Sequence, residues 1–400
     1  MTPLLDRERL TNYPRIFLAL YVTIGGWWLF TGSGLLDRSG KPIGVDFVTF
    51  WAASSLALQG EAAGAWNLVR ITAVERAVIG AEIPPYAFHY PPTFLLFLAP
   101  LALLAYPYAL LAWWSATVAA FLSVVRRIAP TPVTAGLALA FPGFFQNIIQ
   151  GQNGAFTAAL LGAGLLEVDR RPLVGGALLG MLSYKPHLAP LVGLALLAGR
   201  RWRALGAAVV TALVAAGVSA LVFGPEAWVA FRGNVPFALR VLETEGVLPW
   251  FRMPTVQVAA MLLGAPPPVA RIAQGVSTLV AAILVARVWG QGASLAARAS
   301  VLACAAILAT PFAFDYDLAV LAIPVAFLGY DRWKNGWQRG ERPLLVAAWA
   351  APLAAPAIAE WTSVSLTPLL LLALVWTASL RTAAARTGAL DAPAAPGVAS

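Results

Sequence analysis

Long apolar runs dominate the sequence, and short charged links separate them. The first run, residues 16–36, is 21 residues long, about the length that a helix needs to cross the hydrocarbon core of a bilayer. Only 27 basic and 18 acidic side chains occur among 400 residues, whereas a soluble domain would carry roughly one charged residue in four. Because 60% of the residues are hydrophobic, more apolar surface is present than a water-soluble globule could bury. The sequence therefore predicts an all-α integral membrane protein that crosses the bilayer many times.

The apolar runs predict a bundle of about twelve transmembrane helices. We expect them at 16–36, 93–125, 132–147, 154–168, 172–187, 188–199, 204–223, 270–288, 299–312, 317–330, 343–358 and 361–380. Several are shorter than the roughly 20 residues that a perpendicular helix needs, so we expect broken or partly inserted helices. The run 93–125 is long enough to kink at Pro100 and Pro107. The spacing Gly176-xxx-Gly180 favours helix packing.

The basic residues predict the orientation of the bundle. Eighteen of the 27 fall on one side of the predicted spans, which the positive-inside rule assigns to the cytoplasm together with both termini. No small-residue cleavage site follows the first run, so we interpret it as an anchor and not as a signal peptide. We expect one transmembrane domain over 1–381 and a disordered cytoplasmic tail over 382–400. The long segments 37–92 and 224–269 then lie outside the cytoplasm.

The two long segments contain apolar stretches that are typical of short interfacial helices. Residues 46–59 combine aromatic and small side chains, and residues 253–264 show a similar amphipathic pattern. Irregular backbone near a membrane must be shielded by protein or line a wet cavity. We therefore expect the two segments to cover a vestibule.

Ionisable and amide side chains gather at the extracytoplasmic ends of the predicted spans, which is costly unless they have a function. They are Asp46, His89, Gln150, Gln152, Asn153, Lys185, His187, Asp315 and Asp317. Asp46 precedes a predicted helix, so its carboxylate could serve equally as an N-cap or as a general base with a raised pKa. For Lys185 the helix-breaking Pro186 and Pro190 favour a phosphate site over snorkelling to the interface.

The remaining members of this set allow more than one interpretation. The segment Gln150–Asn153 is most simply a polar turn with Gly151 and Gly154 at positive φ, although amides also suit sugar hydroxyls. Asp315 and Asp317 could follow the helix dipole, pair with Lys185, or bind hydroxyls or a cation. The two histidines, His89 and His187, lie on separate loops and form no metal-ligand pattern, so we predict no metal and no cofactor.

Six motifs in order resemble glycosyltransferase family 87, whose members are multi-pass enzymes of the GT-C type. The motifs are Asp46 in DFxxFWAA, Tyr90-Pro91-Pro92, Gly151-Gln152-x-Gly154, RRPLxxGxxLG over 170–180 with Lys185-xxxx-Pro190, Arg200-Arg201-Trp202-Arg203, and Thr310-Pro311. The resemblance covers residues 10–380. The family often has a His after the Thr-Pro pair, but residues 312–317 contain none.

The resemblance implies a transfer of a hexose, mannose in the characterised members, from a polyprenyl-phosphate donor to a lipid or glycan acceptor. It implies Asp46 as the base of an inverting single displacement and Lys185, with His187, at the donor phosphate. His89, Tyr90, Gln152 and Asn153 would then position hydroxyl groups, with Asp315 and Asp317 completing the substrate site. The implied location is a bacterial plasma membrane, with the active site on its extracytoplasmic face.

A transporter or lipid flippase is the main alternative, with Lys185, His187, Asp315 and Asp317 as an ion or proton pathway. Transporters of the common folds usually contain two related halves, whereas the motifs here do not repeat. The net charge of +9 follows from the cytoplasmic arginines and does not indicate nucleic acid. Membrane lipids are the expected surroundings.

Overall fold

The computed structural model describes residues 5–386, with side chains to residue 380, and this range contains helices and no β-strand. The predicted all-α class is therefore confirmed. The first half contains α1 (Arg7–Phe30), α2 (Phe47–Leu58), η1 (Ala62–Trp66), α3 (Leu68–Ile79), α4 (Pro92–Leu98), η2 (Ala99–Leu103), α5 (Tyr106–Ile128), α6 (Thr134–Leu139), α7 (Pro142–Ile149), α8 (Gly154–Glu167), α9 (Pro172–Met181), η3 (Leu182–Tyr184) and α10 (Ala189–Ala198). The second half contains α11 (Trp202–Phe223), α12 (Pro225–Glu243), η4 (Trp250–Arg252), α13 (Val256–Leu262), α14 (Pro267–Gly290), α15 (Leu295–Leu308), η5 (Asp315–Leu321), α16 (Ala322–Asn335), α17 (Glu341–Thr362) and α18 (Thr367–Arg386).

Proline at the first turn starts many of these helices. It occupies the first or second position of α4, α5, α7, α9, α10, α12 and α14. Its fixed φ suits a helix start, and the N–H that it lacks would have no partner within the helix. Asn67 caps α3 by accepting from the N–H groups of Val69 and Arg70, and Gly80 ends that helix in the left-handed conformation. The sequence thus divides the apolar material into many short helices.

Two short helices form the centre of the molecule. Every residue of α15 from Ala297 to Leu308 is buried, and most of α8 is buried too. Helices α9 and α11 approach closely through small residues, because a Cβ at Gly176 would collide with the carbonyl of Ala204 and one at Gly180 with that of Ala208. The predicted packing role of these two glycines is confirmed.

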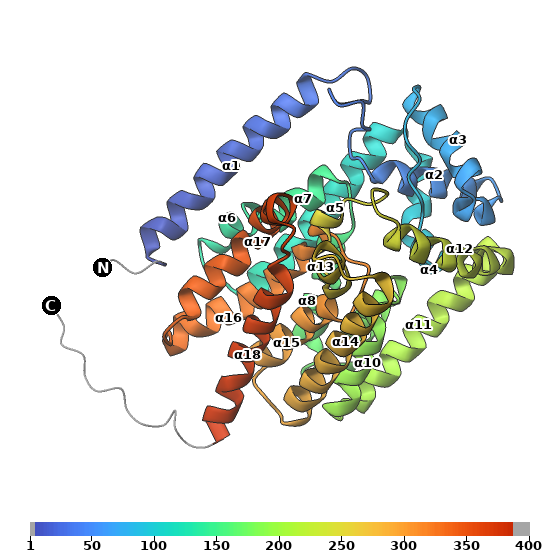
Figure 1. Ribbon diagram of the computed structural model, residues 1–400. Helices are drawn as coiled ribbons and strands as arrows, with labels where there is room; N and C mark the ends of the chain where they lie inside the picture. The colour runs from blue at the N-terminus through green and yellow to red at the C-terminus, as the bar shows by residue number, and fades with distance from the viewer. Residues whose placement is uncertain (1–4, 387–400) are drawn as a thin grey trace.

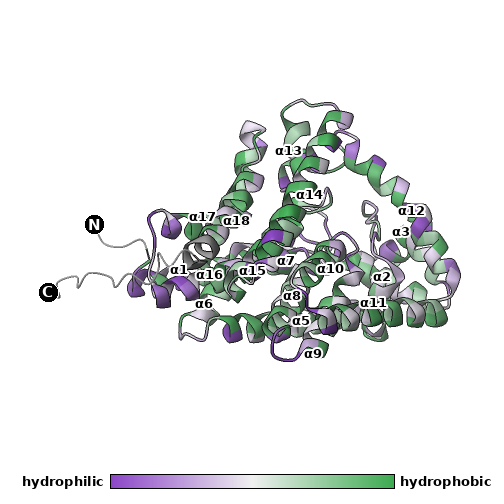
Figure 2. Ribbon diagram, turned by 90° about the horizontal axis from the view of Figure 1, so that it is seen from below, coloured by the Kyte–Doolittle hydropathy of each residue, from purple (hydrophilic) through white to green (hydrophobic). Residues whose placement is uncertain are grey.

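The outer helices turn apolar side chains outward. Within the described residues, α5, α11, α14 and α17 are long and apolar enough to cross a membrane. Exposed aliphatic residues line α11 and α14, and Figure 2 shows the hydrophobic colour along both helices. A water-soluble protein rarely exposes apolar surface of this extent. The chain is a membrane protein, while the count of twelve spans remains a prediction.

Several helix bounds differ from the predicted spans. The first helix ends at Phe30, and the segment 93–125 divides into α4, η2 and α5 because prolines stand at Pro100 and Pro107. Residues 132–147 form two short helices, and α18 continues through residues 382–386 of the predicted tail. The rest of that tail, 387–400, lies outside the described residues. In the loop 224–269, α12 is a helix that we did not predict.

Ion pairs gather the predicted cytoplasmic links at one end of the bundle. Asp169 pairs with Arg201 and with Arg298, and Glu167 pairs with Arg127. Four links that the positive-inside rule places on one side are therefore joined in space. In Figure 1, α12 lies at the same edge of the molecule as α2 and α3, and α1 lies along another side.

Candidate active site

A tight turn sets Asp46 at the start of α2. Gly44 and Val45 both have positive φ, +83° and +33°, and the latter is unfavourable for a β-branched residue. The N–H of Asp46 donates to the carbonyl of Gln150 at 3.1 Å, which fastens the turn to the link between α7 and α8. The Asp46 carboxylate makes no capping hydrogen bond to α2. The N-cap interpretation of its carboxylate is thus wrong.

The carboxylate of Asp46 belongs instead to a hydrogen-bonded series of three side chains, Asp46, Gln152 and Tyr90, which we call the Asp46 chain. Gln152 donates from Nε2 to Oδ2 of Asp46 at 2.9 Å, and Oε1 of Gln152 accepts from the Tyr90 hydroxyl at 3.2 Å. The backbone N–H of Asn153 also donates to Oε1. These partners fix the orientation of the Gln152 amide. The other oxygen of Asp46, Oδ1, accepts no hydrogen bond from the described residues and can receive one from a substrate.

The two glycines around Gln152 bring three segments together. Gly151 has φ +61°, and a Cβ there would lie 2.5 Å from the carbonyl oxygen of Gly44. Gly154 is not at positive φ, so our prediction of that conformation is wrong for it. It is needed for space, because a Cβ would collide with the carbonyl of Tyr316. The motif therefore packs against the Asp46 turn on one side and η5 on the other.

Lys185 and Asp317 form a buried ion pair. The Nζ of Lys185 donates to Oδ1 of Asp317, and the two side chains are only 4% and 10% exposed. Lys185 therefore does not snorkel to an interface. The other oxygen of Asp317 accepts from the N–H of Phe314 at 3.0 Å. Of the alternatives for Asp317, the structure contains two: the pair with Lys185, and a position in the first turn of η5, where a carboxylate favours the helix dipole.

A second ion pair contains Arg252, which the sequence did not single out. Its Nε and one terminal nitrogen each donate to Asp315 at 2.8 Å, in the bidentate geometry that arginine favours with carboxylates. Arg252 lies in η4, within the long segment 224–269. Arg252 is one of the basic residues in the long loops, where positive charge says little about the orientation of a membrane protein. No feature of the sequence therefore distinguished it.

The acidic residues are electrostatically coupled. Desolvation raises the pKa of Asp46, the hydrogen bond from Gln152 and the charge of Arg252 lower it, and Asp315 and Asp317 raise it again, with a net increase. The ring of Tyr90 lies 6.3 Å from that of Tyr184, which directly precedes Lys185. The Asp46 chain, the Lys185–Asp317 pair and the Arg252–Asp315 pair therefore form one cluster of polar side chains, which we call the constellation.

Three other predicted residues occupy different surroundings. The Asn153 side chain is fully buried, and neither of its polar atoms has a hydrogen-bond partner among the described residues. His187 is half-buried beside Lys185. His89 is exposed and faces away from the Asp46 chain, because its Nδ1 lies 3.1 Å from Nδ2 of Asn234 on α12. The structure thus separates His89 from the other members.

A carboxyl group outside the predicted set interacts electrostatically with Asp46. Glu75 on α3 is fully buried, its Oε2 accepts from the N–H of Tyr86 at 3.1 Å, and its Oε1 has no hydrogen-bond partner within the described range. Burial raises its pKa to about 7. The described residues contain no cluster of three or more His, Cys, Asp or Glu side chains that could hold a metal ion.

A family model described as glycosyltransferase family 87 matches residues 88–311, more than half of the chain. The chain belongs to glycosyltransferase family 87. Family 87 is one of the GT-C-like membrane glycosyltransferases, so the protein is a membrane glycosyltransferase. The matched range includes Tyr90, Gln152, Lys185 and Arg252 but not Asp46. No curated protein and no solved structure matched the chain.

Proposed function

We propose that this glycosyltransferase moves a hexose, with mannose the first candidate, from a polyprenyl-phosphate donor to a hydroxyl of a lipid or glycan acceptor. The observation that carries the proposal is the Asp46 carboxylate, which is oriented by Gln152 while its other oxygen accepts no hydrogen bond from the described part of the chain. Membership of family 87 favours this function over a transporter or flippase. Activated sugar and acceptor would meet beside the constellation of Asp46 and the two ion pairs.

Asp46 acts as the general base in this proposal. Its Oδ1 takes the proton of the acceptor hydroxyl while the hydroxyl oxygen bonds to the anomeric carbon. The bond between that carbon and the donor phosphate oxygen breaks, and the electron pair leaves with the phosphate. One displacement inverts the anomeric configuration. The raised pKa of Asp46 makes the carboxylate a stronger base than an ordinary aspartate.

Lys185 stabilises the charge on the departing phosphate. An ammonium has three N–H donors, and Asp317 receives only one hydrogen bond from Lys185, so donors remain for phosphate oxygens. The low exposure of the pair strengthens its electrostatic effect. His187, two residues further on, would face the same phosphate.

The amide and hydroxyl groups around Asp46 would bind sugar hydroxyls. Asn153 is the strongest candidate, because a buried amide without partners is costly and a sugar hydroxyl could satisfy both its donor and its acceptor. Tyr90 and Gln152 would share this task, together with Asp315 and Asp317.

We also propose that this site lies on the extracytoplasmic face of a bacterial plasma membrane. The positive-inside rule supports that orientation. Because Cys304 is buried, a cysteine introduced at exposed Glu245 can be labelled selectively. A membrane-impermeant maleimide added to whole cells should label Glu245→Cys and not Arg170→Cys. The reverse pattern would overturn the orientation.

A panel of donors tests the proposed function. Purified full-length protein in lipid nanodiscs should transfer sugar from at least one polyprenyl-phosphate hexose and from no nucleotide sugar. NMR of the product should show the anomeric configuration opposite to that of the donor. Retained configuration, or transfer from nucleotide sugars alone, would contradict the proposal.

A further inference from the structure

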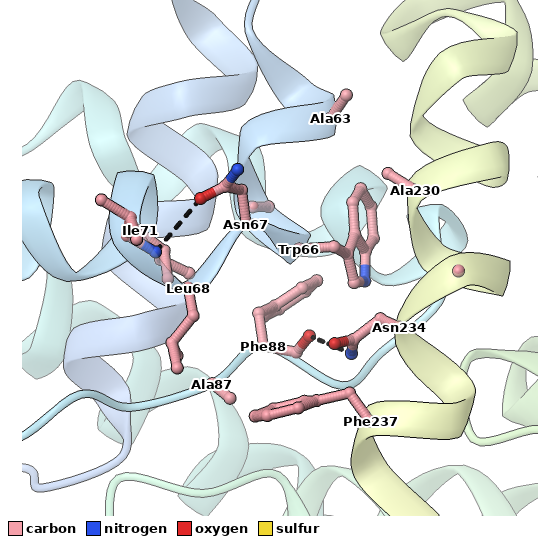
Figure 3. A pocket seen from close by; sticks show the side chains of 13 residues that line it. Ala63, Trp66, Asn67, Leu68, Ile71, Ala87, Phe88, Ala230, Asn234 and Phe237 are labelled. Carbon is pink, nitrogen blue, oxygen red and sulfur yellow. Dashed lines mark hydrogen bonds between the residues drawn. The ribbon is translucent and has the colours of Figure 1, made fainter.

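A cavity of about 490 Å³ lies beside the constellation, between the start of α3, the segment 87–88 and α12. Trp66, Phe88 and Phe237 supply aromatic surface, and Asn67 and Asn234 stand on facing walls (Figure 3). Its volume falls within the ~300–1,000 Å³ of small-molecule pockets. Its lining contains none of the side chains assigned to the reaction.

The lining indicates an uncharged ligand with hydroxyl groups. None of the lining residues is ionisable, so nothing in the cavity would balance a phosphate or carboxylate. Asn67 uses its carbonyl oxygen to cap α3, and its amide nitrogen donates no hydrogen bond to the described residues. Asn234 uses its nitrogen towards Phe88 and His89, and its oxygen accepts none there. An alkyl chain would cover the Asn67 amide nitrogen and the Asn234 amide oxygen without replacing their hydrogen bonds to water. A sugar could form hydrogen bonds with both atoms.

The cavity is physically joined to the Asp46 chain. The indole N–H of Trp66 donates to the carbonyl of Tyr90 at 3.0 Å, and the hydroxyl of the same tyrosine donates to Gln152. The segment 87–90 therefore lines the cavity through Ala87 and Phe88 and belongs to the candidate active site through Tyr90. A ligand in the cavity would contact the same short segment that positions Gln152.

We propose that this cavity binds a non-reacting sugar unit of the acceptor glycan. The inference rests on the proposed function, and it gives His89 a role at the edge of this subsite through Asn234. Binding energy from a remote part of a substrate can orient the reacting group. The expected ligand is a neutral saccharide of one or two units.

Gly233 allows the cavity to be filled without disturbing its walls. It lines the cavity from within α12, and a Cβ built there meets nothing within 4 Å. Gly233→Leu therefore places a side chain in the empty space and also removes a helix-weakening glycine. Gly217→Leu on α11 is the matched control, because it too has open space around its Cβ but lies outside the cavity.

The test uses a photoreactive methyl dimannoside as probe on full-length protein in nanodiscs, with labelled peptides identified by mass spectrometry. We expect wild type and Gly217→Leu to be labelled on α12 and on residues 63–71, with competition by unmodified methyl dimannoside. Gly233→Leu should lose this labelling by about tenfold or more, as when groups are added to a close-fitting pocket. Equal labelling of the two glycine variants would overturn the subsite. Selective labelling of the same peptides by a photoreactive fatty alcohol would overturn it in favour of a lipid tail.

The experiment separates this inference from the proposed function, since labelling needs no turnover. Asp46→Asn should be labelled like wild type. If the dimannoside labels the cavity and no donor of the panel supports transfer, only the proposed function fails. Suppose instead that wild type transfers sugar from a donor of the panel. If Gly233→Leu then transfers sugar to mono- and disaccharide acceptors as efficiently as wild type does, only the subsite fails.

Discussion

The amide of Gln152 donates a hydrogen bond of 2.9 Å to the carboxylate of Asp46, a residue 106 positions earlier in the chain. The contact joins the turn before α2 to the link before α8, and the Tyr90 hydroxyl extends it to a third segment. Each of the three segments lies next to the first residue of an apolar helix, α2, α4 or α8. A polar chain at this place in a membrane protein is costly unless it has a function.

Replacing Gln152 should shift the pH dependence of sugar transfer. The rate should rise with pH as Asp46 loses its proton, at a pH above the ordinary range for aspartate because its pKa is raised. Gln152 stabilises the ionised form, so Gln152→Ala should raise this pKa further and move the rise to higher pH. Gln150→Ala is the control, because only the backbone carbonyl of Gln150 contacts Asp46. An unshifted profile for Gln152→Ala would contradict the hydrogen bond to Asp46.

Adding a methyl group at Gly151 or Gly154 should reduce transfer strongly. The new Cβ would push the Asp46 turn away from Gly151, or η5 away from Gly154. A displacement of about 1 Å can reduce a catalytic rate by about 100-fold. Gly193→Ala, where a Cβ has open space, should behave like wild type. Rates and melting temperatures measured together would distinguish misplacement from unfolding. Wild-type rates for both variants would refute the close packing.

Removing Arg252 should destabilise the protein. Arg252→Ala leaves the carboxylate of Asp315, only 3% exposed, without its bidentate partner. Breaking a buried pair in this way typically costs about 3–5 kcal/mol, and less here because Arg252 itself is partly exposed. The double variant Arg252→Met/Asp315→Leu should recover much of the loss. Thermal unfolding in nanodiscs measures all three proteins, and equal melting of Arg252→Ala and wild type would contradict the pair.

Glu75 should make stability fall as pH rises. Its pKa is about 7 in the folded protein, against an ordinary value of 4.5, so below about pH 4.5 the carboxyl is neutral in both states and costs nothing. Between about pH 4.5 and pH 7 the Glu75 carboxyl has lost its proton in the unfolded chain but keeps it in the folded protein. The free energy of unfolding therefore decreases by about 3 kcal/mol in total over this range. Glu75→Gln should remove this component. Melting curves from pH 4 to 8 should therefore converge at low pH, with the variant more stable at pH 8. Parallel curves would contradict the raised pKa.

The sequence was informative where composition and local chemistry determine the outcome. Membrane character, the all-α class and the helix packing at Gly176 and Gly180 follow from apolar runs and small-residue spacing, and the structure contains them. The segments carrying Asp46, Tyr90 and Gln152 were identified by polar residues at the ends of apolar runs. Their direct contact was not predicted, because hydrogen bonds across 106 residues depend on tertiary packing.

Other features had no local signal. Arg252 resembled any exposed loop arginine until η4 was placed against Asp315. Glu75 lies in an ordinary amphipathic helix, and only the packing around α3 buries it. The family resemblance gave His89 and Tyr90 the same role, yet adjacent residues in an extended segment point to opposite sides. That alternation places His89 towards α12 and Tyr90 towards Gln152.

Sugar transfer by Asp46→Asn tests the central claim most directly. Purified wild type and variant would be compared in nanodiscs with the same polyprenyl-phosphate donor and acceptor, with melting temperature as the control for folding. Asparagine keeps the size of the side chain but cannot take a proton, so we predict that the folded variant transfers no measurable sugar. Transfer by Asp46→Asn at the wild-type rate would show that another group is the base.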